Sequence, residues 1–165
     1  MRGAILAMVL AQQIQLPREI PKLTGKFLVA TPKSQDRDFA RSVILVIHSD
    51  VDGVMGLIIN RRGSSRTWFG GPIPLGVREL FPSPVQPGDA ERVVSGVYLT
   101  RKVDDRQGSR VYAGYAGWSV PQWDGEVSRG LWRIVAADPK LVFDPHPETL
   151  WQRLSSRPPA GRFSK

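Results

Sequence analysis

The 165-residue sequence contains no cysteine and only two histidines. Without cysteine the chain cannot form a disulfide scaffold, use a thiol nucleophile or hold an iron–sulfur cluster through thiolates. Two histidines argue against a metal site built from several imidazoles. The longest apolar run, Ala4 to Ala11, is far shorter than the ~20 residues that a transmembrane helix needs. We therefore expect no metal, no cofactor and no transmembrane segment.

Hydrophobic residues make up 41 % of the chain, as in an ordinary globular protein, and the length suits one domain. The net charge is +8, and the basic excess lies in two stretches. Residues 61–110 contain nine basic and five acidic residues, and residues 151–165 contain four basic residues and no acidic one. We divide the chain into an N-terminal extension (1–22), one folded domain (23–156) and a basic tail (157–165).

The N-terminal extension fits two interpretations. A basic start precedes a short apolar stretch that ends in small residues at Ala11, a pattern typical of a secretory signal peptide. The apolar side chains of the same stretch are spaced by four, which is typical of an amphipathic helix. Pro17 and Pro21 would end such a helix before the domain begins. Cleavage of Met1–Ala11 would mean that the protein is exported.

A tight β-hairpin is the clearest element in the domain. Val43 to Ile47 is an unbroken, largely β-branched run, typical of a strand that is buried on both faces. Asp52-Gly53 follows, and a second apolar run begins at Val54. Glycine tolerates the positive φ of a two-residue turn, so these runs predict two paired strands.

Shorter patterns predict the other elements. Further strands are expected at 27–30, 92–100 (with a bulge at Gly96), 110–116 and 131–137, and helices at 122–129 and 147–156. Five prolines within 72–87 indicate irregular backbone there, with one helical turn at 77–81. Strands that alternate with single helices predict one α+β domain with a mixed sheet.

Candidates for catalytic chemistry are few. His48, Ser49 and Asp50 are consecutive, so on a strand they alternate between faces and cannot form a Ser-His-Asp relay among themselves. The sequence contains no G-x-S-x-G nucleophile motif and no phosphate-binding glycine loop. His146 stands between two prolines and is interpreted as a helix cap or surface residue. A hydrolase-type enzyme remains an alternative, and it requires His48 to lie exposed in a cleft beside a carboxylate.

A basic loop provides a second alternative. Arg61, Arg62 and Arg66 lead into Trp68 and Phe69, and arginines beside aromatic side chains can bind single-stranded nucleic acid through phosphate contacts and stacking. The chain could then be a transcriptional regulator that binds nucleic acid through this loop. The sequence shows no helix-turn-helix, zinc-finger or basic-zipper pattern.

Several motifs, taken in order, resemble the YqgE/AlgH family of bacterial proteins. They are Leu23–Pro32, Phe39–Ile44, DGVMGLIIN (52–60), Gly70–Pro72, GYAGW (114–118) with Gln122, Trp132 with Ala136–Asp138, Phe143-Asp144 and Leu150-Trp151. The resemblance implies a single-domain α+β fold with a mixed, partly barrel-like β-sheet flanked by a few helices. It implies a cytoplasmic location and no established activity, although members are often described as transcriptional regulators.

The chain departs from the family pattern at the positions that are most tempting as catalysts. The usual Cys-Glu-His before the Asp-Gly turn reads Ile47-His48-Ser49 here, and the usual Leu-His is not recognisable in Leu80-Phe81-Pro82. We therefore expect a non-enzymatic, regulatory domain that binds an unknown small ligand or protein partner. The candidate surface consists of Asn60, Arg61, Arg62, Arg66, Gly70, Gly71, Pro72, Tyr115, Trp118 and Gln122.

Overall fold

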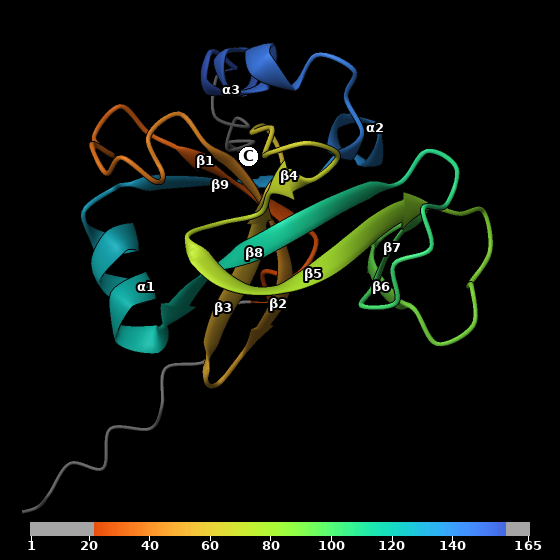
Figure 1. Ribbon diagram of the computed structural model, residues 1–165. Coiled ribbons are helices and arrows are strands. Elements are labelled where there is room, and N and C mark those ends of the chain that lie inside the picture. The colour runs from red at the N-terminus through yellow and green to blue at the C-terminus, as the bar shows by residue number, and fades with distance from the viewer. Residues whose placement is uncertain (1–21, 158–165) are drawn as a thin grey trace, which may run out of the picture.

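The computed structural model describes residues 22–157, and its strands form one curled sheet that resembles half of a barrel (Figure 1). The strands are β1 (Lys26–Ala30), β2 (Val43–Asp50), β3 (Gly53–Ile58), β4 (Trp68–Phe69), β5 (Ile73–Pro82), β6 (Glu91–Val94), β7 (Val97–Thr100), β8 (Arg110–Ser119) and β9 (Trp132–Ala136). Their order is β6-β7-β5-β8-β3-β2-β1-β9, and β4 pairs with β8 in parallel while the other pairs are antiparallel. The predicted α+β domain with a mixed, partly barrel-like sheet is confirmed.

Strand β8 joins the two halves of the sheet. Its first part pairs with β4 and β5, and its last part pairs with β3. Near the point where β8 changes partners, its backbone lies close to that of its neighbours. Gly114 has a φ of +72°, and a Cβ there would lie 2.7 Å from the carbonyl oxygens of Gly71 and Ile73. Glycine is needed because any side chain would separate the strands. Gly114 of the GYAGW motif thus serves the architecture of the sheet.

Phe27–Ala30 of β1 and Val43–Ile47 of β2 are buried on both faces, which explains the uninterrupted apolar sequence of these segments. Leu45 belongs to one core cluster, which also contains Leu150, whereas its neighbour Ile44 belongs to a second cluster with Trp132. Every residue of Val43–Ile47 is at most 4 % exposed. The predicted strand and the Asp52-Gly53 hairpin are therefore confirmed, and β2 and β3 form that hairpin.

Three helices flank the sheet, α1 (Val120–Ser128), α2 (Pro139–Val142) and α3 (Pro147–Ser155), and α1 lies at the opposite end of the molecule from β6 and β7 (Figure 1). Ser119 and Gln122 form a capping box at the start of α1, and Gly130, with a φ of +69°, follows its end. The predicted helices at 122–129 and 147–156 are confirmed with small shifts at their ends. None of the helices in residues 22–157 is long and apolar enough to cross a membrane.

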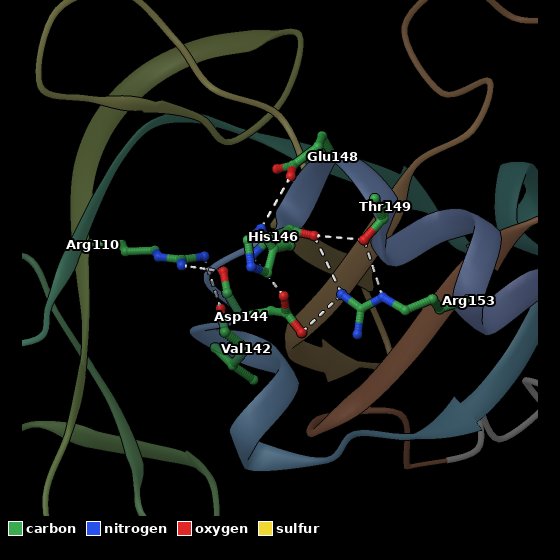
Figure 2. Close-up of polar contacts among 7 residues, drawn as sticks. All are labelled: Arg110, Val142, Asp144, His146, Glu148, Thr149 and Arg153. Atoms are coloured by element: carbon green, nitrogen blue, oxygen red, sulfur yellow. Dashed lines mark hydrogen bonds and ion pairs between the residues drawn. The ribbon is translucent and has the colours of Figure 1, made fainter.

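A polar cluster fastens the α2–α3 segment to strand β8 (Figure 2). Asp144 forms an ion pair with Arg153 at 2.9 Å and accepts the backbone N–H of His146 at 2.7 Å. Burial alone would raise the pKa of Asp144, but Arg153 and the His146 amide outweigh burial and hold it below the usual value. Arg110 donates to the carbonyl oxygens of Val142 and Asp144. The polar groups of the cluster pair with one another, so we assign the cluster a structural role.

The prediction of irregular backbone across 72–87 holds for residues 83–87 and is wrong for 73–82, where no helical turn forms at 77–81. Residues 73–82 form β5, whose register shifts between Ile73 and Val77, so that Pro74 lies within the irregular stretch and not in the ladder. Pro82 is the last residue of the strand. The prolines are tolerated because they occupy a bulge and a strand end, where a missing N–H is least costly.

Other details of the predicted elements also differ. The single strand expected at 92–100 is a hairpin of β6 and β7, and Gly96, with a φ of +76°, lies in its turn and not in a bulge. No pattern in the sequence predicted the two-residue strand β4 or the one-turn helix α2. The interpretations of the N-terminal extension and the basic tail concern residues outside 22–157, apart from Lys22 and Arg157, and stay predictions.

Candidate functional site

A cavity of about 570 Å³ lies between the β2–β3 hairpin and strands β5, β6 and β7. Its size is within the range usual for small-molecule sites. The lining residues are Ile47, His48, Met55, Arg78, Asp89, Glu91, Leu99, Thr100, Arg101 and Lys102. The wall thus combines an apolar part with charged groups of both signs.

Arg78 is the unusual member of this wall, because it is a cation that is only 7 % exposed. Its guanidinium lies 4.9 Å from the centre of the Tyr115 ring, and Nη1 donates one long hydrogen bond, 3.4 Å, to the carbonyl oxygen of Leu75. Among residues 22–157, no carboxylate forms an ion pair with it. Burial lowers the pKa of Arg78, and the positive charge of Arg101 lowers it further.

The strand period places Arg78 in the cavity and its neighbour Glu79 on the other face of β5. Glu79 is fully buried, and its carboxylate accepts the backbone N–H groups of Asp104 and Arg106, each at 2.8 Å, and the Arg106 guanidinium at 2.7 Å. Burial alone would raise the pKa of Glu79, but these donors outweigh burial and hold it below the usual value. Glu79 therefore fixes the loop whose first residues, Arg101 and Lys102, line the cavity.

His48 and Asp50 form a dyad at the edge of the cavity. The distance from His48 Nε2 to Asp50 Oδ2 is 2.8 Å, and both side chains are exposed. The hydrogen bond from His48 and the N–H of Asp52 lower the pKa of Asp50. Residues two apart share a face of a strand, so His48 can pair with Asp50 although Ser49 points elsewhere. The geometric condition set for the hydrolase alternative, an exposed His48 beside a carboxylate in a cleft, is met.

The predicted surface residues of the loop after β3 are partly engaged in contacts within the fold. Asn60 accepts from the N–H of Val43 and donates to the carbonyl of Arg41, each at 2.9 Å. Arg61 donates to carbonyl oxygens in the 36–41 segment. Arg62 stacks over Trp68 at 4.7 Å, and Arg66 is exposed. Only Arg62 and Arg66 of this group remain available to a ligand.

The turn at Gly70, Gly71 and Pro72 lies beside Tyr115, as predicted. Gly70 donates its N–H to the carbonyl of Ala113 at 2.8 Å, and a Cβ on Gly71 would collide with the Tyr115 backbone. Gly71 also lines a second, apolar cavity of about 340 Å³. Among the ten residues of the candidate surface, Tyr115 contacts the wall of the larger cavity, through Arg78.

Trp118 and Gln122 lie away from the other predicted residues, at the end of β8 and in α1. Trp118 is 5 % exposed, packs in edge contacts with Trp123 and Trp132, and donates its indole N–H to Glu126 at 2.8 Å. Gln122 is occupied in the capping box of α1. The structure thus assigns both residues to the fold, and the proposed role in a shared surface stays a prediction for the remaining members.

Most residues that line the larger cavity belong to no sequence pattern that predicted a site. Arg78 stands in the run Val77–Phe81, for which the sequence predicts a helical turn. With a strand period, Arg78 shares a face with the apolar Leu80, and a charge on a core-facing position would have marked it. Within the described part of the chain, no group of three or more carboxylate or imidazole side chains is placed to hold a metal ion.

Comparisons with known proteins agree with the sequence motifs. The family model described as DUF179, AlgH-like, matches residues 27–159. A UPF0301 protein of Methylococcus capsulatus is 32 % identical over 170 residues, which cover 82 % of this chain and 93 % of that protein. A UPF0301 protein of Streptomyces coelicolor is 31 % identical and covers 84 % of this chain and 88 % of that protein.

Two solved structures share the fold. A protein of Corynebacterium diphtheriae superposes with a TM-score of 0.73 and 23 % identity over 83 % of this chain and 87 % of its own. The AlgH protein of Pseudomonas aeruginosa gives a TM-score of 0.69 with 24 % identity over 86 % of this chain and 92 % of its own. At these identities the structures show a common architecture alone. The family match, which covers most of the chain, shows that this protein belongs to the AlgH-like family of UPF0301 proteins.

Proposed function

We propose that the protein is a binding domain for a small anionic ligand, which it holds in the cavity between the β2–β3 hairpin and strands β5 to β7. The observation that supports this most is Arg78, a nearly buried guanidinium in the cavity wall with no carboxylate partner among residues 22–157. A buried cation is costly unless an anion compensates it. A carboxylate or phosphate group of a ligand would do so, because guanidinium binds both in a bidentate manner.

Two further features support an anionic ligand. Arg101 and Lys102 add positive charge to the same cavity, and Glu79 holds their loop in place. The Tyr115 ring supports the guanidinium of Arg78 from one side, which limits its freedom before a ligand arrives. Binding to nucleic acid through the Arg61–Arg66 loop has less support, because Arg61 is already engaged with backbone oxygens of the fold.

The test is titration of the ¹⁵N-labelled protein with glutarate and with inorganic phosphate in a buffer of low ionic strength. The side-chain Nε–Hε signal of Arg78 is observed by NMR, and the variant Arg78→Met assigns it. We expect saturable shifts that include this signal, and at least tenfold weaker binding in Arg78→Met, because a hydrogen bond to a charged group contributes about 1.5–3 kcal/mol.

Arg92→Met is the matched control, since Arg92 is an exposed arginine of the neighbouring strand β6 and does not line the cavity. It removes the same charge from the protein and should leave the affinity within about twofold, because exposed charges act weakly at a distance. Equal losses in both variants would indicate attraction by net charge alone, and the proposal would then be wrong. Absence of a saturable shift of the Arg78 signal with these anions and with carboxylate-bearing zwitterions such as L-leucine would equally overturn it.

A second candidate function is hydrolysis of a bound ester, and the His48–Asp50 dyad is the observation that favours it. His48 would accept a proton from water as the water oxygen attacks the ester carbon, and the departing alkoxide would take a proton from the imidazolium. The measurement is release of p-nitrophenol from p-nitrophenyl acetate by wild type and His48→Gln. Equal rates, after subtraction of the buffer rate, would refute this function without affecting the binding proposal.

A further inference from the structure

The charged groups around the larger cavity divide by sign. Arg78, Arg101 and Lys102 are cationic, and Asp89 and Glu91 are acidic. Within the described residues none of these five side chains forms an ion pair with another or with any third group. The charge of Glu91 acts on Arg78 at a distance and not through an ion pair, so groups of both signs remain available to a ligand.

An anion without a positive group would pair with the cationic side chains of this wall but not with the acidic ones. Its negative charge would meet Arg78 favourably, but Asp89 and Glu91 line the same cavity and would repel any second negative charge of the ligand. A ligand that carries both a carboxylate and an ammonium group meets both signs. The apolar surface of Ile47 and Leu99 would face the rest of such a molecule.

We infer that the ligand of this cavity is a zwitterion, an apolar α-amino acid or a dipeptide of such residues, with its carboxylate on Arg78 and its ammonium group facing Asp89 and Glu91. This inference rests on the proposed anion-binding function and names the chemical class of the ligand. The carboxylate binds the buried end of the site, where the guanidinium is only 7 % exposed. The ammonium group lies at the β6 side, where Glu91 is exposed and water remains close.

The experiment uses a matched pair of probes. L-Leucine and 4-methylpentanoate have the same carbon skeleton and carboxylate, and they differ only in the ammonium group. L-Leucyl-L-leucine extends the zwitterion by one residue. Each compound is titrated into the wild-type protein and into the double variant Asp89→Asn/Glu91→Gln, with the Arg78 Nε–Hε signal as the readout. Both substitutions retain side-chain size and remove only the negative charge.

For the wild-type protein we expect at least one of the two zwitterions to bind tenfold or more tightly than 4-methylpentanoate. In the double variant this preference should fall to about twofold or less, while 4-methylpentanoate binds as well as before or better, since the repulsion by two carboxylates is gone. A preference that survives the double substitution would overturn the inference, as would equal binding of leucine, the dipeptide and 4-methylpentanoate to the wild type.

The two proposals fail in different ways. If glutarate or phosphate binds through Arg78 but neither zwitterion binds more tightly than 4-methylpentanoate, the zwitterion inference is wrong and the anion-binding function stands. If no anion or zwitterion shifts the Arg78 signal, both are wrong. Circular dichroism of the double variant checks its fold, and Glu91→Gln alone provides a milder version that should lose part of the preference.

Discussion

Substitution of Glu79 by glutamine should strongly destabilise the protein, because this carboxylate is the centre of a buried network. Its two oxygens accept three donors: the N–H groups of Asp104 and Arg106 and the guanidinium of Arg106. Glutamine keeps one oxygen but turns its NH₂ group toward donors, so at least one bond is lost and the remainder lose their charge. Breaking a buried, charged pair costs about 3–5 kcal/mol, and we expect a loss in that range.

The assay is urea unfolding at pH 7, followed by tryptophan fluorescence, since the chain has five tryptophans. Glu91→Gln provides the control: the same change at an exposed position should shift the free energy of unfolding by no more than about 0.5 kcal/mol. Should Glu79→Gln unfold on expression, Arg106→Gln offers a milder version, because it leaves both backbone donors on the Glu79 carboxylate. Arg106 is partly exposed, so its contribution is screened and we expect about half the loss.

The pH dependence gives an independent check. The pKa of Glu79 is lower in the folded state than the ordinary value of 4.5, so its contribution to stability is present above that value and is lost as the pH falls through the folded pKa. The difference in free energy of unfolding between wild type and Glu79→Gln should therefore shrink below about pH 4.5. A difference that is equal to that of the control, or that does not change with pH, would refute the assigned role of Glu79.

Three other positions give predictions of the same kind. Tyr112→Phe should raise stability by about 1 kcal/mol at pH 7, since its buried hydroxyl forms no hydrogen bond within residues 22–157. The gain should grow above pH 10, because burial raises the pKa of Tyr112 to about 12; thermal melts from pH 7 to 11 check both. Gly71→Ala should cost about 3 kcal/mol in urea unfolding, as its Cβ would collide with backbone that cannot yield. Asp144→Asn should cost about 2 kcal/mol at pH 7, and less below about pH 4, where the wild-type carboxylate loses its contact with Arg153.

Local patterns predicted the parts of the fold that local interactions determine. Asp52-Gly53 and its flanking apolar runs specify a hairpin without help from the rest of the chain, and Gly130 ends α1 for a reason that lies in its own φ angle. The sequence predicts no strand at 73–82, because the five prolines within 72–87 normally exclude one. Here the pairing with β8, about 35 residues further along the chain, tolerates Pro74 and Pro82 at a bulge and an end.

The candidate site was predicted less well, because its residues gather from distant segments. The residues that line the cavity come from positions 47 to 102 of the chain. Arg78 can be recognised as a lining residue only once the register of β5 is known, because the register decides which face of the strand it occupies. Tyr115 stands out in the sequence because of its glycine neighbours. No local pattern could predict its contact with Arg78, because the two residues lie far apart in the sequence. The His48–Asp50 pair was within reach, because residues two apart share a face of any strand.

Arg78 and Glu79 are neighbours in the chain, and the structure treats their charges in opposite ways. Glu79 is fully buried with three donors, whereas Arg78, nearly as buried, has one long hydrogen bond and an aromatic ring. Where a charged residue stabilises the fold, removal of its charge lowers the free energy of unfolding. Where a buried charge is kept for a ligand, the ligand-free protein bears the free-energy cost of burying it without a partner. Arg78→Met should therefore leave the free energy of unfolding unchanged or raise it by up to about 2 kcal/mol, the reverse of Glu79→Gln. A loss above about 1 kcal/mol in the ligand-free protein would show that Arg78 stabilises the fold, and the anion site would lose its main support.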